Sequence, residues 1–569
     1  MRPRLAPALP LFAALLLAAC GRSGAGADDP RNRHGGPNGD YSYPATDYRE
    51  QPADKTAARP GGTLRLATAT DTGSLDIHAL SHGNVQWLGR MLFDNLVYLD
   101  DRGRVTPWLA RAWEISPDGK TYTFHLRPGV TFSDGTPFDA AAVQANLEHM
   151  RDPRTKSPLA AAYIVPYVDG RIVDPLTFEA HLSQPYGPFL NVLAQSWLGL
   201  ISPRQIRDHP ETIATRPIGS GPFVLESYVR QQRVALVRRA DYDWAPEYLD
   251  HKGAAYLARV EVDIVPEPLG RYTGLTSGQY ALLADAPPQN AAAIRADPRL
   301  IFDSRIRTGI PYRAISFNLD RAPFDDVRVR RALAIAVDRQ GITRSVFFDE
   351  NLATTDFLAR TTRFYDPAFS NMLRFDRAAA NRLLDAAGWK ARDAQGYRTR
   401  GGVRLGADLL SQDSSTLAAI NVAVQDDLKK VGFALRIVQL PIPQLTARRN
   451  SGDFQALASG VWHTNTPDAL YILHHSGEIT SPRRIGQNNS HVRDATLDDL
   501  LARARRSTDA GALKILYSAA QKRLNEIVPG IPLDENHSNV AYDRSVHGLL
   551  FDTSHNTPVI TAAWLDNPK

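Results

Sequence analysis

Residues 105–143 read VTPWLARAWEISPDGKTYTFHLRPGVTFSDGTPFDAAAV, and this stretch carries the pattern that decides the fold. Apolar side chains alternate with polar ones over residues 121–126 and again over 130–132, as they do in half-buried strands. Pro128 and Gly129 lie between the two runs and are typical turn residues. The spacing predicts a β-hairpin that turns at this dipeptide.

Further along the chain, strand signals are interleaved with helix signals. Alternation predicts strands over residues 61–70 (GGTLRLATAT), 176–182 (LTFEAHL), 233–239 (RVALVRR) and 260–265 (VEVDIV). Apolar residues at helical spacing predict helices over 325–346, from Asp376 to Gly388, and over 417–431. Asp325 or Asp326 is available to cap the first helix. The chain is therefore expected to be mixed α/β with more than one lobe.

The N-terminus carries the marks of a secretion signal. Arg2 and Arg4 precede an uncharged run that ends at Ala19, and this run is too short for a membrane span of about 20 residues. Residues 17–20 (LAAC) resemble the lipobox of bacterial lipoproteins, which predicts cleavage after residue 19 and a lipid on Cys20. An ordinary secreted protein with an incidental cysteine is the alternative. Because Cys20 is the only cysteine, no thiol remains for disulfides, zinc or nucleophilic chemistry.

Composition excludes several other classes of protein. The formal net charge is +5 on 569 residues, with no Lys/Arg block, so a nucleic-acid partner is not expected. No later segment is long and apolar enough to predict a membrane span. Residues 20–59 are rich in Gly, Pro, Asp and Arg and are expected to form a flexible linker of roughly 35 Å root-mean-square length behind the lipidated cysteine.

Five segments resemble the family-5 extracellular solute-binding proteins, the receptors of dipeptide, oligopeptide and nickel ABC importers. They are residues 105–143, quoted above, 216–225 (RPIGSGPFVL), 315–339 (ISFNLDRAPFDDVRVRRALAIAVDR), 375–389 (FDRAAANRLLDAAGW) and 454–462 (FQALASGVW). Most of these motifs also have a purely structural interpretation. Gly219 and Gly221, for example, are expected to let the backbone cross between lobes.

The resemblance implies an α/β fold of the periplasmic-binding-protein type II (cluster C) kind, with two hinged lobes and an extra inserted domain. The implied division is signal 1–19; lipidated cysteine and linker 20–59; lobe I 60–104, 216–311 and 545–569; inserted domain 105–215; lobe III 312–544. Such a receptor is expected to close around a solute without changing it and to present the closed form to the permease. It would act as a monomer, lipid-anchored on the periplasmic side of the cell envelope, without cofactor or metal.

The ligand motif departs from the family pattern. Peptide receptors of this family carry a tryptophan followed three residues later by an aspartate, which pairs with the α-amine of the peptide. Here the stretch is SGVWHTNTPDALYILHH (459–475): Trp462 aligns, His463 follows, and Asn465 replaces the acid. A buried ammonium without its counter-ion costs about 3–5 kcal/mol. Either another acid such as Asp468 serves, through a shifted loop, or the solute lacks a free amine.

Other candidate contacts come from the resemblance. Thr70, Asp71 and Ser74 follow the first predicted strand, which in the family ends at the cleft mouth, so they could bind ligand or simply cap a loop. Trp197 and Tyr312 could line the pocket, although an aromatic residue is more often part of the core.

The nickel alternative is weaker, because the neighbours His474 and His475 would point apart on a strand. The residues SWLGLISP (196–203) also hold Gly199 where nickel receptors carry an arginine.

The sequence is weighed against three kinds of function: a receptor, an enzyme and a sensor. A receptor for a peptide or peptide-like solute is favoured, with a metal chelate, an opine or another small organic molecule as alternative solutes. An enzyme is not expected, since the sequence lacks Gly-x-Ser-x-Gly, His-Glu-x-x-His and Ser-x-x-Lys motifs. A sensor that keeps the fold but passes its ligand to another protein is the third possibility.

Overall fold

The computed structural model of the chain describes residues 58–80, 84–100, 103–249, 251–311, 313–460, 465–481, 485–535, 537–552 and 557–566. The secretion signal, Cys20, most of the linker and the site candidates Tyr312, Trp462 and His463 lie outside these residues. Within the described part of the chain, no helix is long and apolar enough to cross a membrane.

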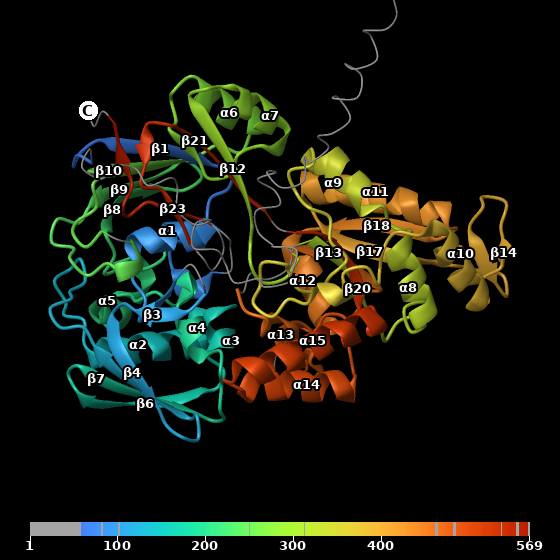
Figure 1. Cartoon of the computed structure of the whole chain (residues 1–569), viewed down its shortest axis with the longest axis horizontal. Helices are drawn as coiled ribbons and strands as arrows, with labels where there is room; N and C mark the ends of the chain where they lie inside the picture. The colour runs from blue at the N-terminus through green and yellow to red at the C-terminus, as the bar shows by residue number, and fades with distance from the viewer. Residues whose placement is uncertain are drawn as a thin grey trace, which may run out of the picture.

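The first large sheet has seven strands in the order β12-β21-β11-β1-β10-β9-β8 (Figure 1). These are β1 Thr63–Thr68, β8 Phe223–Val229, β9 Arg233–Arg238, β10 Arg259–Ile264, β11 Leu282–Leu283, β12 Leu300–Ile306 and β21 His537–Asp543. Strands were predicted at β1, β9 and β10; β1 runs parallel to β10, which is antiparallel to β9. Leu64 and Leu66 are buried in one core with residues of α1 (Asn84–Leu92), whereas Arg65 between them is exposed.

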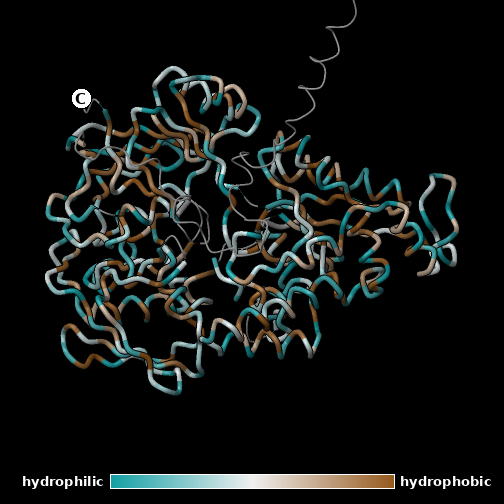
Figure 2. The backbone as a smooth tube through the Cα atoms, in the orientation of Figure 1, coloured by the Kyte–Doolittle hydropathy of each residue, from teal (hydrophilic) through white to brown (hydrophobic). Residues whose placement is uncertain are grey.

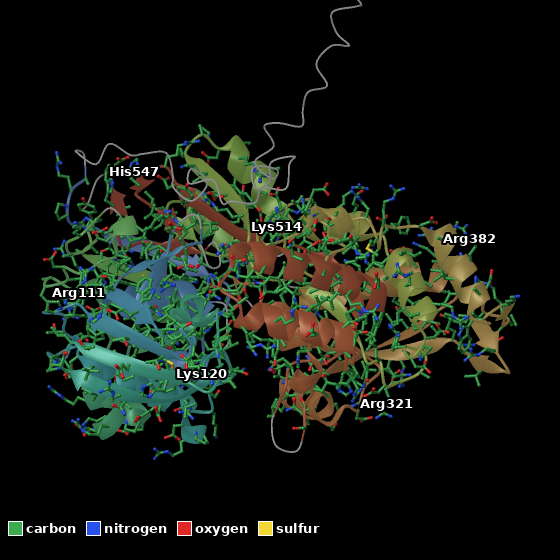
Figure 3. All side chains as sticks on the ribbon, turned by 60° about the horizontal axis from the view of Figure 1, so that its bottom comes forward. Arg111, Lys120, Arg321, Arg382, Lys514 and His547 are labelled. Carbon is green, nitrogen blue, oxygen red and sulfur yellow. The ribbon has the colours of Figure 1, made fainter. Side chains whose placement is uncertain are left out.

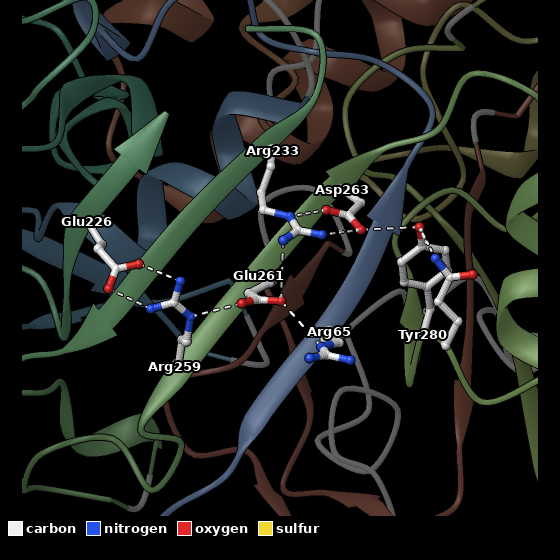
Figure 4. Close-up of polar contacts among 8 residues, drawn as sticks. Arg65, Glu226, Arg233, Arg259, Glu261, Asp263 and Tyr280 are labelled. Carbon is white, nitrogen blue, oxygen red and sulfur yellow. Dashed lines mark hydrogen bonds and ion pairs between the residues drawn. The ribbon is translucent and has the colours of Figure 1, made fainter. Parts of the chain in front are cut away.

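Charged side chains form a ladder across one face of β1, β8, β9 and β10 (Figure 4). The ion pairs include Arg65–Glu261 at 3.3 Å, Arg233–Asp263 at 2.5 Å and Arg259–Glu226 at 2.5 Å. Exposed ion pairs contribute about 1 kcal/mol at most. The main effect of the ladder is therefore to keep this face of the sheet polar and hydrated, and its contribution to the stability of the sheet is small.

A smaller antiparallel sheet lies in the stretch expected to be inserted, in the order β4-β5-β7-β6. Its strands are β4 Ala110–Ile115, β5 Thr121–Leu126, β6 Tyr167–Asp174 and β7 Thr177–Leu182. The predicted hairpin at Pro128-Gly129 is wrong, because β5 pairs with β4 and β7. Residues after this turn close on themselves instead: the Phe138 N–H donates to the Val130 carbonyl at 2.9 Å. Val130 and Phe132 are buried, and Thr131 between them forms only an isolated antiparallel bridge with Pro137.

The second large sheet has five strands in the order β18-β17-β19-β13-β20. They are β13 Arg313–Phe317, β17 Gly406–Gln412, β18 Ala434–Leu440, β19 Ala456–Gly460 and β20 Gly530–Asp534. Two predicted helices beside this sheet are confirmed. Asp376 caps α10 (Arg377–Ala386), and α11 (Ser415–Lys430) is followed by Gly432 at φ +84°.

The long helix predicted over 325–346 is instead two helices, α8 (Val327–Ala336) and α9 (Arg339–Phe347). Asp338 separates them, and its carboxylate accepts a hydrogen bond from the Gly341 N–H at 3.0 Å. An aspartate bonds to the backbone more favourably at a cap than inside a helix, so the helix begins again at this residue.

The remaining elements are short or lie around the sheets. The other helices are α2 Ala140–Arg151, α3 Ala160–Tyr163, α4 Phe189–Leu193, α5 Pro203–Asp208, α6 Pro268–Thr276, α7 Ala291–Ala296, α12 Ile442–Ser451, α13 Ala469–His474, α14 Ala495–Arg506 and α15 Ala510–Ile527. The small sheets pair β2 Val97–Leu99 with β3 Val105–Pro107, β22 Val546–His547 with β25 Trp564–Leu565, β23 Leu550–Phe551 with β24 Pro558–Val559, and join β14 Ala391–Arg392, β15 Arg398–Arg400 and β16 Val403–Arg404.

The molecule consists of two bodies, each with its own large hydrophobic core (Figure 2). We call the described residues of 58–306 and 537–566 the first body, and those of 313–535 the second body. Long charged side chains such as Arg111, Lys120 and Arg382 project from their surfaces (Figure 3).

The chain crosses between the bodies twice, from β12 to β13 and from β20 to β21. Arg313 and Asp534 face each other at the crossings as strand partners and form an ion pair of 2.9 Å. Because β21 belongs to the seven-stranded sheet, the chain leaves the second body between residues 534 and 537.

The glycines of PIGSGPF have a different role from the one expected. Gly219 and Gly221 are not at positive φ, and the segment stays within the first body. A Cβ on Gly219 would lie 1.9 Å from the Leu92 carbonyl oxygen, and a Cβ on Gly221 would lie 2.5 Å from the Leu92 carbonyl carbon. Glycine is required because this segment passes directly against the end of α1.

Candidate functional site

The two bodies touch where residues 186–195 of the first body meet the loops around α13 and α14 of the second. The Tyr186 hydroxyl donates to Asp468 Oδ2 at 3.2 Å, and Gln195 Nε2 donates to Asn465 Oδ1 at 2.5 Å. The Gly187 N–H donates to the Arg505 carbonyl at 3.0 Å. A Cβ on Gly187 would lie 2.4 Å from a backbone oxygen of the second body, so glycine permits this close contact.

Asp468 is one half of a buried ion pair. Arg505 Nη2 lies 3.1 Å from Asp468 Oδ2, and both side chains are more than nine-tenths buried. The guanidinium also lies over the rings of Tyr471 and Tyr186, at 3.9 and 4.9 Å from their centroids. Burial opposes its charge, but Asp468 and the two tyrosines raise the pKa of Arg505 above its ordinary value. The Asp468 carboxylate is thus already neutralised by a cation of the protein.

An open cavity lies between the two bodies at this contact. Its volume is about 830 Å³, including the solvent at its mouth. Residues of both bodies line it, among them Pro188, Asn191, Arg363, Asn465 and Asp468. Asp468 is the one acid among the described residues that line this interbody cavity. The Arg363 side chain is exposed and lies over the ring of its neighbour Phe364, at 4.6 Å.

The loop after β1 does not line the interbody cavity. Asp71 accepts hydrogen bonds from the Tyr228 hydroxyl and the Gln231 N–H, both at 2.8 Å, and Ser74 Oγ accepts from the Asp76 N–H at 3.1 Å. Although burial acts in the opposite direction, these hydrogen bonds lower the pKa of Asp71. Thr70 is exposed. The contacts of Asp71 and Ser74 match a capped loop, which was the structural alternative for these residues.

Trp197 lies in the core of the first body, not at a pocket wall. It is fully buried in the short 3₁₀ segment Ser196–Leu198, and its ring centroid is 6.4 Å from that of Tyr163. The two histidines expected on a strand are at a helix end instead. His474 is the last residue of α13 and His475 is its C-cap.

Asn465 and Asp468, the two residues that the sequence offered for this motif, both line the interbody cavity, whereas their partners Gln195 and Tyr186 were not predicted. Gln195 contacts a residue 270 positions away, and Tyr186 contacts one 282 positions away. No local motif marks either residue, since a single Tyr or Gln carries no spacing pattern that points to a partner elsewhere in the chain. Only the tertiary fold places them opposite the second body.

Known proteins resemble the chain over nearly its whole described length. The model of bacterial extracellular solute-binding proteins, family 5 Middle, matches residues 104–480. Glutathione-binding protein GsiB of Escherichia coli (strain K12) is 26% identical over 500 residues, covering 85% of this chain and 91% of GsiB. The probable deoxycholate-binding periplasmic protein YgiS of the same strain is 28% identical over 500 residues, covering 84% and 89%.

A solved structure shows the same fold. The periplasmic binding protein DppA of Helicobacter pylori, in complex with the peptide STSA, superposes with a TM-score of 0.75 at 23% identity, covering 90% of this chain and all of DppA. The two bodies thus have the periplasmic-binding-protein type II fold expected from the sequence. Because the family model covers more than half of its length, the chain belongs to the family-5 bacterial extracellular solute-binding proteins, which are transport receptors of ABC importers and not enzymes.

Proposed function

We propose that this receptor captures a peptide-like small solute between its two bodies and delivers it to the permease of its importer. A solute that contacts both bodies favours the arrangement in which they touch. The interbody cavity and the hydrogen bonds beside it support this proposal. In the proposed division, residues 105–215 form the inserted domain, and lobe III begins at 312 and ends at the return crossing.

The charges around the interbody cavity support a solute that has a carboxylate and no free amine. Position 465 holds an amide already bonded to Gln195, and Asp468 is paired with Arg505. An incoming ammonium would therefore meet no unpaired acid among the described lining residues, whereas a carboxylate would meet Arg363. An N-blocked peptide fits this description. So does deoxycholate, the solute in the name of YgiS; glutathione, which has a free amine, does not.

Calorimetry with N-acetyl-Ala-Ala and Ala-Ala tests the solute class. We expect the acetylated dipeptide to bind about tenfold more tightly or better, since an uncompensated buried ammonium is costly. Asn465→Asp should change the ratio of the two affinities by about tenfold in favour of Ala-Ala, because a carboxylate at this position can neutralise the amine. Asn371→Asp, the same change at an exposed position of the second body, is the matched control. Tighter binding of Ala-Ala by the unmodified receptor would contradict the proposal.

We also propose that a lipid on Cys20 anchors the mature receptor on the periplasmic side of the envelope, as a monomer. The support is the LAAC sequence after an apolar run, together with relatives that are periplasmic binding proteins. In cell fractionation, the natural chain should sediment with membranes and Cys20→Ala should move to the soluble fraction. A Cys20→Ala protein that stays with the membranes would refute the anchor.

A further inference from the structure

A second cavity lies almost entirely within the second body, apart from the interbody cavity. Its volume is about 530 Å³, including the solvent at its mouth. One side is a face of β13 and β20, and the others are the end of α13, residues 487–490 and residues 356–357. Only Ile310 and Pro311, on the crossing itself, come from outside the second body.

The sheet leaves room for this cavity because its side chains there are small. Ala314 and Ser316 of β13 pair with Pro532 and Gly530 of β20, so all four lie on one face. Ile315, between Ala314 and Ser316 on β13, is part of the core of the second body, although it also borders the cavity. The side chains of Ala314 and Ser316 are half-buried. They form a floor of small side chains, with one hydroxyl, that is not filled by the described part of the protein.

Among the described lining residues, two titratable side chains border this floor, the imidazole of His474 and the carboxyl of Asp356. Burial raises the pKa of Asp356 although the nearby Tyr365, Arg360 and Arg339 act in the opposite direction. His474 is about nine-tenths buried, and its Nδ1 has no hydrogen-bond partner among the residues that the structure describes. Burial lowers the pKa of His474 to about 3, so the imidazole is neutral in the cell. Its ring meets that of Phe357 edge to face, with 6.0 Å between centroids. The one acid in the lining, Asp356, accepts a hydrogen bond from the Tyr365 hydroxyl at 2.6 Å.

Two further groups at the cavity can form hydrogen bonds. Gln487 and Asn489 are half-buried, and no other described residue bonds to their side-chain amides. Apolar walls with a few neutral donors and acceptors suit an uncharged apolar group attached to an amide or hydroxyl. An anionic group would have to leave water without meeting a Lys or Arg in the described lining, and a cationic group would meet only Asp356, whose pKa burial raises.

We propose that this cavity is a subsite for an uncharged apolar side chain of the solute, and that it binds this side chain before the two bodies close. The proposal rests on the proposed function, because it assumes that the solute is peptide-like. The statement that the side chain binds before closure follows from the position of the cavity, because nearly all of the residues that line the cavity belong to one body. Contacts made there do not depend on the contact between Tyr186 and Asp468.

Titration with N-acetyl-L-phenylalaninamide, followed by NMR, tests the subsite. We expect saturable binding, and binding of N-acetylglycinamide should be weaker by about tenfold because it lacks the apolar side chain. Ala314→Leu fills the cavity and should weaken binding of the phenylalanine probe by about tenfold. Ala419→Leu, the same change at an exposed position of α11, should leave it within about twofold. If the apolar side chain binds before closure, Tyr186→Phe should weaken binding of the phenylalanine probe by less than about twofold, in contrast to its larger effect on a solute that contacts both bodies.

His474→Phe gives a second readout. Replacing a buried polar group that has no partner should leave Tm unchanged or raise it, and should weaken binding of the phenylalanine probe several-fold. A lower Tm with unchanged binding would assign His474 to packing and overturn its part in the subsite.

Two outcomes would overturn the whole inference. One is no binding of N-acetyl-L-phenylalaninamide to the natural receptor, and the other is unchanged binding to Ala314→Leu. The preference for N-acetyl-Ala-Ala is measured separately, so the proposed function stands if that preference is found while the phenylalanine probe fails.

Discussion

Asp94, directly after α1, shows how a single buried charge sets a pH dependence. It is fully buried and accepts hydrogen bonds from Trp244 Nε1 at 2.8 Å and from the Tyr242 hydroxyl at 3.1 Å. Burial raises the pKa of Asp94 to about 6, and these hydrogen bonds with the nearby Arg239 only partly offset the effect. The folded state therefore holds this proton more tightly than the unfolded chain does.

The sign of the pH dependence follows from this raised pKa. The stabilising contribution of Asp94 is complete below pH 4 and is lost as the pH rises through 6, a difference of about 3 kcal/mol. The free energy of unfolding, measured with urea, should fall between pH 4 and pH 7 in the natural protein by about 3 kcal/mol more than it falls in Asp94→Asn. Parallel curves for the two proteins would show that Asp94 does not titrate in this range.

Among individual residues, the family motif pointed to one segment that lines the interbody cavity, the one that holds Asn465 and Asp468. Their role as ligand contacts stays a prediction. Whether Asp468 carries a free charge could not be read from the motif, since its partner Arg505 is 37 positions away on another helix. Trp197 was judged by residue type alone, and type does not distinguish a pocket wall from a core.

At the scale of single elements, the start of α8 gives a sharp test. The sequence offered both Asp325 and Asp326 as the cap, and the structure assigns the role to Asp326, whose carboxylate accepts from the Arg328 N–H at 2.8 Å. Asp326→Ala should lower the free energy of unfolding by about 1 kcal/mol. Asp325→Ala, at an exposed neighbouring position, should change it by less than about 0.5 kcal/mol. Equal losses in the two variants, measured by urea unfolding, would contradict the assignment.

Elements with local causes were predicted and those with distant causes were not. α10 and α11 follow from a cap, an apolar stripe and a terminal glycine, all within the helix or next to it. The strand β5 pairs with β4, which precedes it, and with β7, which follows much later in the chain. Nothing in residues 121–132 shows that β5 pairs with these strands and not with the residues directly after its turn. Asp338 is a residue type that often caps a helix, but the apolar stripe on both sides of it predicted a single continuous helix.

For the whole molecule, the contact between the bodies should control closure. Tyr186→Phe removes one hydrogen bond from the first body to the charged pair but leaves Asp468 bonded to Arg505. A hydrogen bond to a charged group contributes about 1.5–3 kcal/mol, so solute affinity should fall by about tenfold or more. Small-angle scattering should show a more open average shape. Tyr272→Phe, on the distant helix α6, is the control and should change neither quantity.

The two-body architecture was predicted from the family resemblance, but its exact crossings were not. Strand partners across the chain, such as β12 with β21, depend on contacts more than 200 residues apart. Composition around residues 534–545 does not change where the chain returns to the first body. The boundary at 544 rests on the family resemblance and stays a prediction.

The double crossing has a practical consequence for engineering. The second body is one uninterrupted run of chain, and its two ends lie side by side at Arg313 and Asp534. It can therefore be exchanged as a cassette with the same segment of a related receptor. Such a chimera would bind solute with the first body of one receptor and the second body of another. A fluorophore near the exchange points would report the opening and closing of the bodies, as in a biosensor.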